Sequence, residues 1–210
     1  MGALPQYINK DEFDVRVIMP YYTCIPEKFR NDFKYVTHFY MDYGMRQENM
    51  HVGIMEYEYN GIKFYFVDNE YYFKCDSPYS PNIKWDIERF TFFSKAVLAI
   101  LPVIGFRPDI IHCHDWQASL IPVFLHTAFA TNPFYSSTKT IMTIHNLKFQ
   151  GVWDIETFKY NTALPEYMFT PDKLEFHKNA NMLKGGLVYA DYITTVSETY
   201  AEEIKYPFYG

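Results

Sequence analysis

Residues 109–144, DIIHCHDWQASLIPVFLHTAFATNPFYSSTKTIMTI, decide the fold because they alternate between the two kinds of regular structure. The apolar run at 109–113 predicts a buried strand, residues 117–130 predict a helix, and residues 140–144 predict the next strand. Strands that alternate with helices of this length are typical of a parallel sheet covered by helices. We therefore predict an α/β fold with a doubly wound, Rossmann-like parallel sheet.

The chain before this stretch predicts a strand at 14–19 that closes at Pro20, followed by alternating runs at 35–40, 51–57 and 62–67. Asn60-Gly61 separates the last two runs, and both residue types tolerate positive φ, so we predict a β-hairpin excursion on the sheet. Residues 86–104 have helical spacing of apolar side chains, with Asp86 placed to cap the helix and Pro102 near its end.

The chain after this stretch predicts a helix that is opened by Thr170-Pro171 and runs to residue 189. A strand at 190–196 and a last helix capped by Ser197 follow. Lys184-Gly185-Gly186 lies inside the predicted helix and lacks the strand–loop–helix context of a phosphate loop. We expect these glycines to allow close helix packing instead.

Composition excludes several classes of protein. A length of 210 residues with 49% hydrophobic residues suits one sizeable folded domain. A net charge of −6 without a Lys/Arg cluster disfavours a nucleic-acid partner. The three cysteines are widely spaced, which favours a reducing compartment, and no apolar run approaches the ~20 residues that span a membrane. We expect a soluble, cytoplasmic protein with no membrane partner.

Polar residues follow two of the predicted strands, where ligands of doubly wound sheets bind. Asp115, Trp116 and Gln117 follow the first strand, and His145-Asn146 follows the second. Carboxylate and amide groups bond sugar hydroxyls, an indole covers the apolar face of a pyranose, and histidine donates or accepts near neutral pH. Structural roles remain open: Asp115 as a helix cap, Trp116 packed beneath the helix, and a hydrogen-bonded core histidine.

A metal site formed by His112, His114 and Asp115 is a less favoured interpretation of this stretch than a sugar-binding site. In a strand the two histidines share one face and Asp115 points to the other, so we expect no metal. The chain has no G-x-S-x-G, C-x-x-C or H-E-x-x-H motif, which leaves hydrolase, redox and zinc-protease functions without support. From the residues alone, the chain is a sugar- or nucleotide-binding α/β domain.

Four blocks of sequence carry a resemblance to a known family. ERFTFFSKAVL at 88–98, RPDIIHCHDWQA at 107–118, TIHNLKFQG at 143–151 and LKGGLVYADYITTVSETYAEEI at 183–204 resemble the bacterial glycogen synthase and plant starch synthase family, in the same order. The resemblance implies a GT-B enzyme with two Rossmann-like domains. It further implies retaining transfer of glucose from ADP-glucose to the non-reducing end of an α-1,4-glucan, with no cofactor and no metal.

The resemblance also implies roles for the residues at the two strand ends. His145 would face the donor glucose and stabilise the oxocarbenium-like centre as the catalytic residue. Asp115, Trp116, Gln117 and Asn146 would bind substrate on the glucose and acceptor side. Some relatives have histidine where this chain has Gln117.

Two departures from the family pattern lead us to expect that residues 1–210 are an incomplete N-terminal domain. The family's K-x-G-G-L-A-D-V loop belongs just before residues 1–5, so the first strand is expected to be missing, and residues 206–210 resemble the run before the C-terminal domain, which supplies the diphosphate contacts. We expect the chain alone to be inactive and to self-associate through exposed sheet or interface surface. The alternatives are a non-catalytic glucan-binding module and a GT-B transferase that uses another nucleotide sugar.

Overall fold

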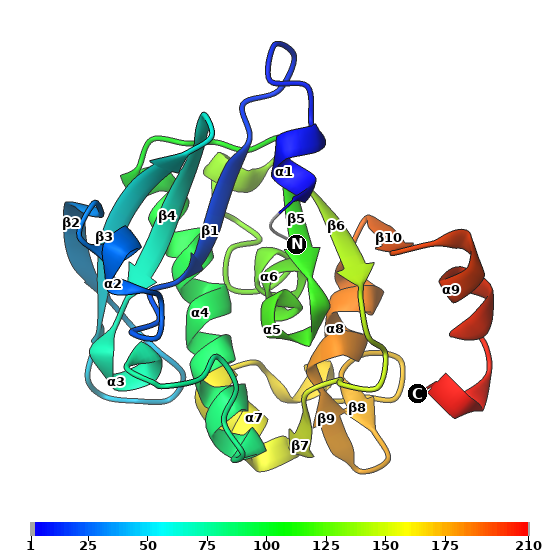
Figure 1. The fold of residues 1–210 in the computed structure, drawn as a ribbon. Coiled ribbons are helices and arrows are strands. Elements are labelled where there is room, and N and C mark those ends of the chain that lie inside the picture. The colour runs from blue at the N-terminus through cyan, green and yellow to red at the C-terminus, as the bar shows by residue number, and fades with distance from the viewer. Residues whose placement is uncertain (1–2, 210) are drawn as a thin grey trace. The chain divides into compact units, whose positions relative to one another are not determined.

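The structure is a computed structural model that describes residues 3–209 (Figure 1). It consists of two compact units. The first contains the residues up to Asp42 together with Asn49–Ser80, and the second contains Tyr43–Glu48 and the residues from Pro81 onward. Both units contain parallel strands followed by helices, which confirms the predicted α/β class.

The first unit is built on a four-stranded sheet with the strand order β1-β4-β3-β2. Strand β1 (Arg16–Pro20) runs parallel to β4 (Ile62–Asp68), whereas β3 (Met50–Tyr59) is antiparallel to β4 and to β2 (Lys34–Met41). Three short helices accompany the sheet: α1 (Leu4–Tyr7), α2 (Glu27–Arg30) and α3 (Glu70–Phe73). The expected N-terminal tail includes Met1 and Gly2, which lie outside the described residues.

The predicted hairpin joins β3 to β4. Tyr59 pairs with Ile62, and the two residues between them, Asn60 and Gly61, have φ of 52° and 70°. Positive φ at both central residues matches the right-handed twist of the flanking strands. The hairpin prediction is therefore confirmed.

The second unit contains a parallel sheet with the order β10-β6-β5. Its strands are β5 (Ile110–His114), β6 (Lys139–Ile144) and β10 (Tyr192–Thr195). The helices are α4 (Ile83–Val103), α5 (Asp115–Ala118), α6 (Leu120–Leu125), α7 (Ile155–Thr162), α8 (Met182–Tyr189) and α9 (Glu198–Glu203). Single 3-10 turns lie at Pro133–Tyr135, Glu166–Met168 and Pro207–Tyr209. Helix α9 is capped by Ser197, as predicted.

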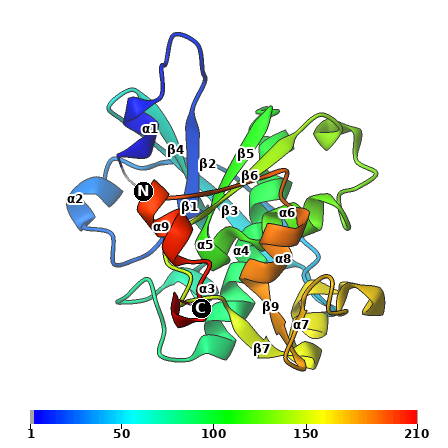
Figure 2. The same cartoon turned by 90° about the vertical axis from the view of Figure 1, so that its right-hand side faces the viewer.

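Helix α8 packs closely against α5 and α6 (Figure 2). A Cβ on Gly186 would lie 2.5 Å from the Cβ of Ser119, closer than two carbon atoms can approach, so only glycine fits there. The Nζ of Lys184 donates to the carbonyl oxygens of Pro171 and Glu175, which commits this lysine to the fold. The interpretation of the glycines as packing residues is confirmed.

Two predicted helices are shorter than expected. The helix expected at 117–130 is divided into α5 and α6 at Ser119 and ends at Leu125. The helix expected from residue 170 begins only at Met182, with Asn181 as its N-cap. The segment before it forms β8 (Glu175–Phe176) and β9 (Asn179–Asn181), which join β7 (Val152–Asp154) in a small antiparallel sheet.

The left-handed backbone of two residues explains the second difference. His177 and Lys178 have φ of 50° and 66° and reverse the chain between β8 and β9. Helical periodicity in the sequence does not reveal such a turn, because neither residue is a glycine or an asparagine.

The start of α4 also differs from the prediction. The helix begins at Ile83, and the side chain of Asn82 accepts a hydrogen bond from the backbone N–H of Trp85 (3.3 Å). Asp86 is not the cap: it is buried and forms an ion pair with Arg89 at 2.8 Å. Pro102 lies in the last turn, and the helix ends one residue later.

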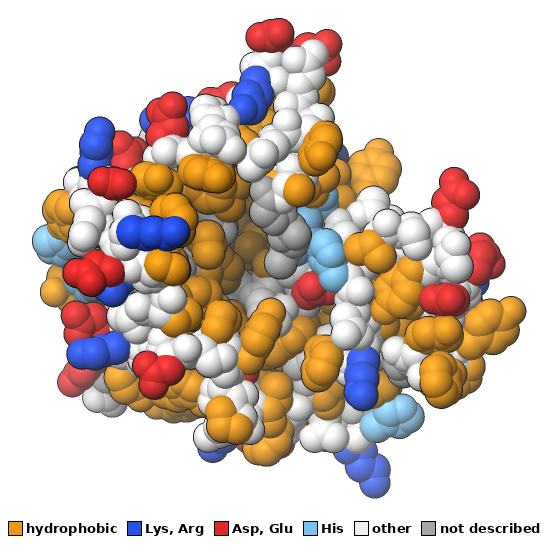
Figure 3. Space-filling view, viewed as in Figure 1, with side chains coloured by type: hydrophobic (Ala, Val, Ile, Leu, Met, Phe, Trp, Pro, Cys, Tyr) orange, Lys and Arg blue, Asp and Glu red, His pale blue; other side chains and the backbone are white. Residues whose placement is uncertain are grey.

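No helix of residues 3–209 is long and apolar enough to cross a membrane. On the face shown in Figure 3, Lys and Arg side chains lie singly among acidic and apolar ones. This face therefore offers no continuous basic surface for a phosphate backbone.

Candidate functional site

The two strand ends singled out in the sequence lie next to each other. Strands β5 and β6 are adjacent and parallel, with His114 paired to Thr143. The residues that follow each strand therefore emerge at the same edge of the sheet. Asp115 follows β5, and His145 and Asn146 follow β6.

Asp115 connects the two strand ends directly. Its Oδ1 accepts hydrogen bonds from the backbone N–H of His145 (2.7 Å) and of Asn146 (3.4 Å). Its backbone has a φ of 55°, a left-handed conformation that costs a non-glycine residue about 1–2 kcal/mol. The carboxylate thus bonds the loop after β6 rather than the first turn of α5.

The imidazole of His145 contacts a second histidine. Its Nε2 lies 3.0 Å from Nδ1 of His114, and the His114 ring in turn lies 4.2 Å from the His112 ring between centroids. Burial, followed by the charges of His112 and His145, lowers the pKa of His114 to about 3. His114 is therefore neutral near pH 7.

His112 ends a row of hydrogen bonds that crosses the sheet. Its Nε2 lies 2.6 Å from Oγ1 of Thr143 on β6, which lies 2.6 Å from Oγ1 of Thr194 on β10. Burial is the main cause of the lowered pKa of His112. Within residues 3–209, no three His, Cys, Asp or Glu side chains are arranged to hold a metal ion.

The loop after His145 is fixed to the start of α8. The carbonyl oxygens of Gln150 and Gly151 accept hydrogen bonds from the N–H groups of Leu183 and Met182, both at 3.0 Å. The Nδ2 of Asn181 donates to Oε1 of Gln150 at 2.6 Å. These bonds satisfy N–H groups in the first turn of α8, which would otherwise have to bond a ligand or water.

Trp116 is buried beneath this loop, whereas the structural role considered from the sequence placed it beneath the following helix. Its side chain is 5% exposed and packs edge-to-face on Phe90, with ring centroids 5.3 Å apart. A Cβ on Gly151 would lie 2.4 Å from the Trp116 ring, so the loop backbone rests on the indole. Trp116 also lines a cavity of about 320 Å³ with Phe149 and Phe176. Its contact with a sugar stays a prediction.

The other two predicted ligand residues differ in exposure. Asn146 is exposed, and its Oδ1 accepts a hydrogen bond from the backbone N–H of Lys148 (3.1 Å). Gln117 is half-buried, and its carbonyl oxygen accepts a hydrogen bond from Ser94 (3.4 Å). The structure thus brings Asp115, His145 and Asn146 together, while Gln117 contributes a backbone contact to the fold.

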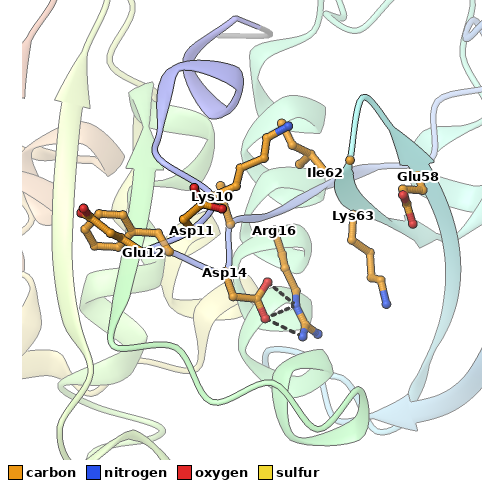
Figure 4. Close-up of a pocket in the computed structure, with 11 residues that line it drawn as sticks. Lys10, Asp11, Glu12, Asp14, Arg16, Glu58, Ile62 and Lys63 are labelled. Carbon is orange, nitrogen blue, oxygen red and sulfur yellow. Dashed lines mark hydrogen bonds and ion pairs between the residues drawn. The ribbon is translucent and has the colours of Figure 1, made fainter.

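A second cavity, of about 450 Å³, lies in the first unit (Figure 4). It is lined by charges of both signs, and Asp14 and Arg16 form an ion pair at 2.8 Å within it. Arg16 and Ile62 begin their strands, so this cavity lies at the amino ends of β1 and β4. Ligands of parallel sheets bind at the carboxyl ends, and we therefore place the candidate site at β5 and β6.

Comparison with known proteins identifies the family of the chain. The starch synthase catalytic domain family matches residues 1–210. The chain belongs to this family. Glycogen synthases from Lachnoclostridium phytofermentans and Lachnospira eligens are each 60% identical over the whole chain, which covers 43% of either relative.

A solved starch synthase shares the fold of this family member. The catalytic domain of starch synthase IV from Arabidopsis thaliana, bound to ADP and acarbose, superposes with a TM-score of 0.87 at 25% identity over 99% of the chain. The match covers 43% of that structure. The chain therefore spans less than half the length of these relatives.

Sequence reasoning missed two contacts of the site. His114 was considered only as a metal ligand, and its contact with His145 depends on the register of β5 against β6. The hydroxyl of Tyr200 on α9 accepts a hydrogen bond from the backbone N–H of Leu147 (3.0 Å). No sequence signal links these last two residues, because the contact joins segments 53 positions apart.

Proposed function

We propose that residues 1–210 form part of a retaining α-1,4-glucosyltransferase of glycogen synthesis, acting in the cytoplasm. It would transfer glucose from ADP-glucose to the non-reducing end of an α-1,4-glucan. Membership of the starch synthase family supports this function. The observation that carries it is the convergence of Asp115, His145 and Asn146 at one edge of a parallel sheet.

In this proposal the chain positions the donor glucose while the bond between its C1 and the diphosphate oxygen breaks and a bond from C1 to the acceptor oxygen forms. The proton of the acceptor hydroxyl passes to the departing diphosphate. Positive charge develops at C1, and the imidazole of His145 stabilises it as a fixed, preorganised group. Asn146 offers its exposed amide to glucose hydroxyls. Diphosphate contacts would come from the part of the relatives that the chain does not match.

The test is a chimera in which residues 1–210 replace the matched 43% of the Lachnoclostridium phytofermentans glycogen synthase. We expect the chimera to incorporate labelled glucose from ADP-glucose into glycogen, and the chain alone to incorporate none, because half a cleft lacks the converging charges. A folded chimera that leaves ADP-glucose unused would contradict the proposed function. A preference for another nucleotide sugar would favour the alternative transferase.

Glucan binding without catalysis is the second candidate, and one observation favours it. Phe149 is 58% exposed at the rim of the cavity lined by Trp116, an arrangement suited to a sugar ring. Titration of the chain with maltooligosaccharide should then change tryptophan fluorescence, and Phe149→Ala should weaken the response. Binding by the chain combined with an inactive chimera would favour this function over synthesis.

We also propose that the chain self-associates through β10. This strand is at the edge of its sheet, and Tyr192, Ile193 and Val196 are 66%, 55% and 55% exposed. Edge strands with apolar side chains pair with other chains. Size-exclusion chromatography should show species larger than a monomer, and Ile193→Lys should shift them toward the monomer; a monomer at all concentrations would contradict the proposal.

A further inference from the structure

The two histidines at the strand ends share one face of the sheet. His114 pairs with Thr143 across β5 and β6, and His145 lies two positions beyond Thr143, so their side chains point the same way. Their rings are 5.2 Å apart between centroids and tilted by 48°. The separation of 3.0 Å between Nδ1 of His114 and Nε2 of His145 is that of a hydrogen bond.

A hydrogen bond between two imidazoles constrains both rings because one proton lies between them. Whichever ring donates, Nε2 of His145 is occupied by His114. Within residues 3–209 no hydrogen bond to Nδ1 of His145 is seen, so Nδ1 is the nitrogen left for a ligand. The hydrogen bond made by one ring nitrogen of a histidine determines which of the two ring nitrogens carries the proton.

The surroundings keep His114 in place as a partner. Its ring lies against that of His112 at a tilt of 34°, and His112 is itself bonded to Thr143. Asp115 holds the backbone of His145 at 2.7 Å. His145 is therefore fixed at both its backbone and its ring. His114 stays neutral, because burial disfavours its charged form, and so it does not take a proton from His145 near pH 7.

We propose that His114 is a positioning residue that fixes the orientation and the tautomer of the His145 ring, so that Nδ1 of His145 faces the donor glucose. The functional half of this statement rests on the proposed glucosyltransfer, in which His145 stabilises the reacting centre. The hydrogen bond itself is open to a test that needs no activity.

Three variants of His114 separate hydrogen bonding from ring shape. Asparagine places its amide where Nδ1 of histidine lies, whereas glutamine places its amide where Nε2 lies. Phenylalanine keeps a ring without hydrogen-bonding atoms. We therefore expect His114→Asn to keep the contact with His145 and both His114→Gln and His114→Phe to lose it.

The direct readout is ¹⁵N NMR of the His145 ring in the 210-residue chain. We expect a single fixed tautomer in the unmodified chain and in His114→Asn, and ring nitrogen shifts averaged between tautomers in His114→Gln and His114→Phe. His126→Phe is the matched control, because its ring bonds the carbonyl oxygen of Pro122 on α6 instead. Averaged shifts in the unmodified chain, or shifts of His145 unchanged in all three His114 variants, would overturn the proposal.

The kinetic readout uses the chimera. We expect kcat to fall about 10- to 100-fold in His114→Gln and His114→Phe, by analogy with the loss seen when the hydrogen-bond partner of a metal-bound histidine is removed. His114→Asn should recover kcat to within a few-fold, with the KM for ADP-glucose little changed throughout. Equal losses in all three variants would show a merely structural role and overturn the proposal. An inactive unmodified chimera would instead contradict the proposed function and leave the NMR result standing.

Discussion

Two parallel strands of the structure end in a polar pair that contains an asparagine, one in each unit. Asp68-Asn69 ends β4 in the first unit, and His145-Asn146 follows β6 in the second. Asn69 is 5% exposed and uses both ends of its amide: Oδ1 accepts from the N–H of Tyr72 (3.1 Å), and Nδ2 donates to the carbonyl oxygen of His51 (2.8 Å).

The side chain of Asn146 is exposed, and within residues 3–209 its Oδ1 is bonded whereas no hydrogen bond of its Nδ2 is seen. The same sequence pattern therefore serves the fold at one strand end and leaves a donor for a ligand at the other. What distinguishes them is the hydrogen-bond partners, which come from distant segments and not from the pair itself.

The largest effect is expected from His145→Ala in the chimera. Removing the group that stabilises the developing charge should lower glucan synthesis about 1,000-fold, within the range for a single catalytic group. Circular dichroism and the thermal midpoint should stay near those of the unmodified chimera, because the ring of His145 is half-buried and its backbone bond to Asp115 remains. Retention of a tenth of the activity would remove His145 from the catalytic role.

The next effect concerns stability, where Asn69 and Asn146 should differ. Asn69→Ala removes the N-cap of α3 and leaves the part-buried carbonyl of His51 without this donor, so the free energy of unfolding should fall by about 2–3 kcal/mol. Asn146→Ala should change it by less than about 0.5 kcal/mol, as is usual for an exposed side chain. Urea unfolding of both variants checks this, and similar losses would show that both asparagines are structural.

A third prediction tests whether Asp115 acts through His145. Asp115→Ala removes the acceptor that holds the backbone of His145 and should lower kcat of the chimera about 10- to 30-fold, a loss of one charge-assisted hydrogen bond. Asp115→Asn is the matched control, because asparagine keeps an oxygen at this position and tolerates the left-handed φ of 55°. An equally large loss in Asp115→Asn would indicate a direct role of the carboxylate charge.

The parts of the fold that were predictable are those fixed by local chemistry. Alternating side chains and Asn60-Gly61 predicted β2, β3, β4 and their hairpin, and apolar runs predicted β5, β6 and β10. The prediction that a helix begins at residue 170 was wrong, because part of this segment forms the small hairpin of β8 and β9. The turn of that hairpin uses non-glycine residues in the left-handed conformation. Tertiary packing overrides a periodic pattern in such cases.

The candidate site was predictable to the level of strand ends but not of partners. Asp115, His145 and Asn146 follow strands, so topology alone brings them together. The sequence left the role of Trp116 open because burial depends on Gly151, which lies on a loop 35 positions later. The contact between His114 and His145 required the register of β5 against β6.

The smallest effect distinguishes the acid response of His114, the hydrogen-bond partner of His145, from that of Asp68 at the end of β4. The pKa of His114 is lowered from 6.5 to about 3, so the unfolded chain binds a proton at this residue more tightly than the folded chain does. The contribution of His114 to stability is therefore complete above pH 6.5 and is lost as the pH falls toward 3. Burial raises the pKa of Asp68 above 3.8, so its contribution is complete below pH 3.8 and is lost as the pH rises through the folded-state pKa.

Replacing His114 or Asp68 with a residue that does not titrate should therefore change the pH dependence of the unfolding free energy in opposite directions. Between pH 6.5 and 4, His114→Asn should reduce the loss of unfolding free energy by about 1–2 kcal/mol, less than the shift alone implies because solvent screens a half-buried ring. Asp68→Asn should increase the loss over the same range, because the gain from protonating Asp68 is removed. Urea unfolding at several pH values measures both slopes, and parallel profiles for the two variants would show that neither His114 nor Asp68 controls the acid response.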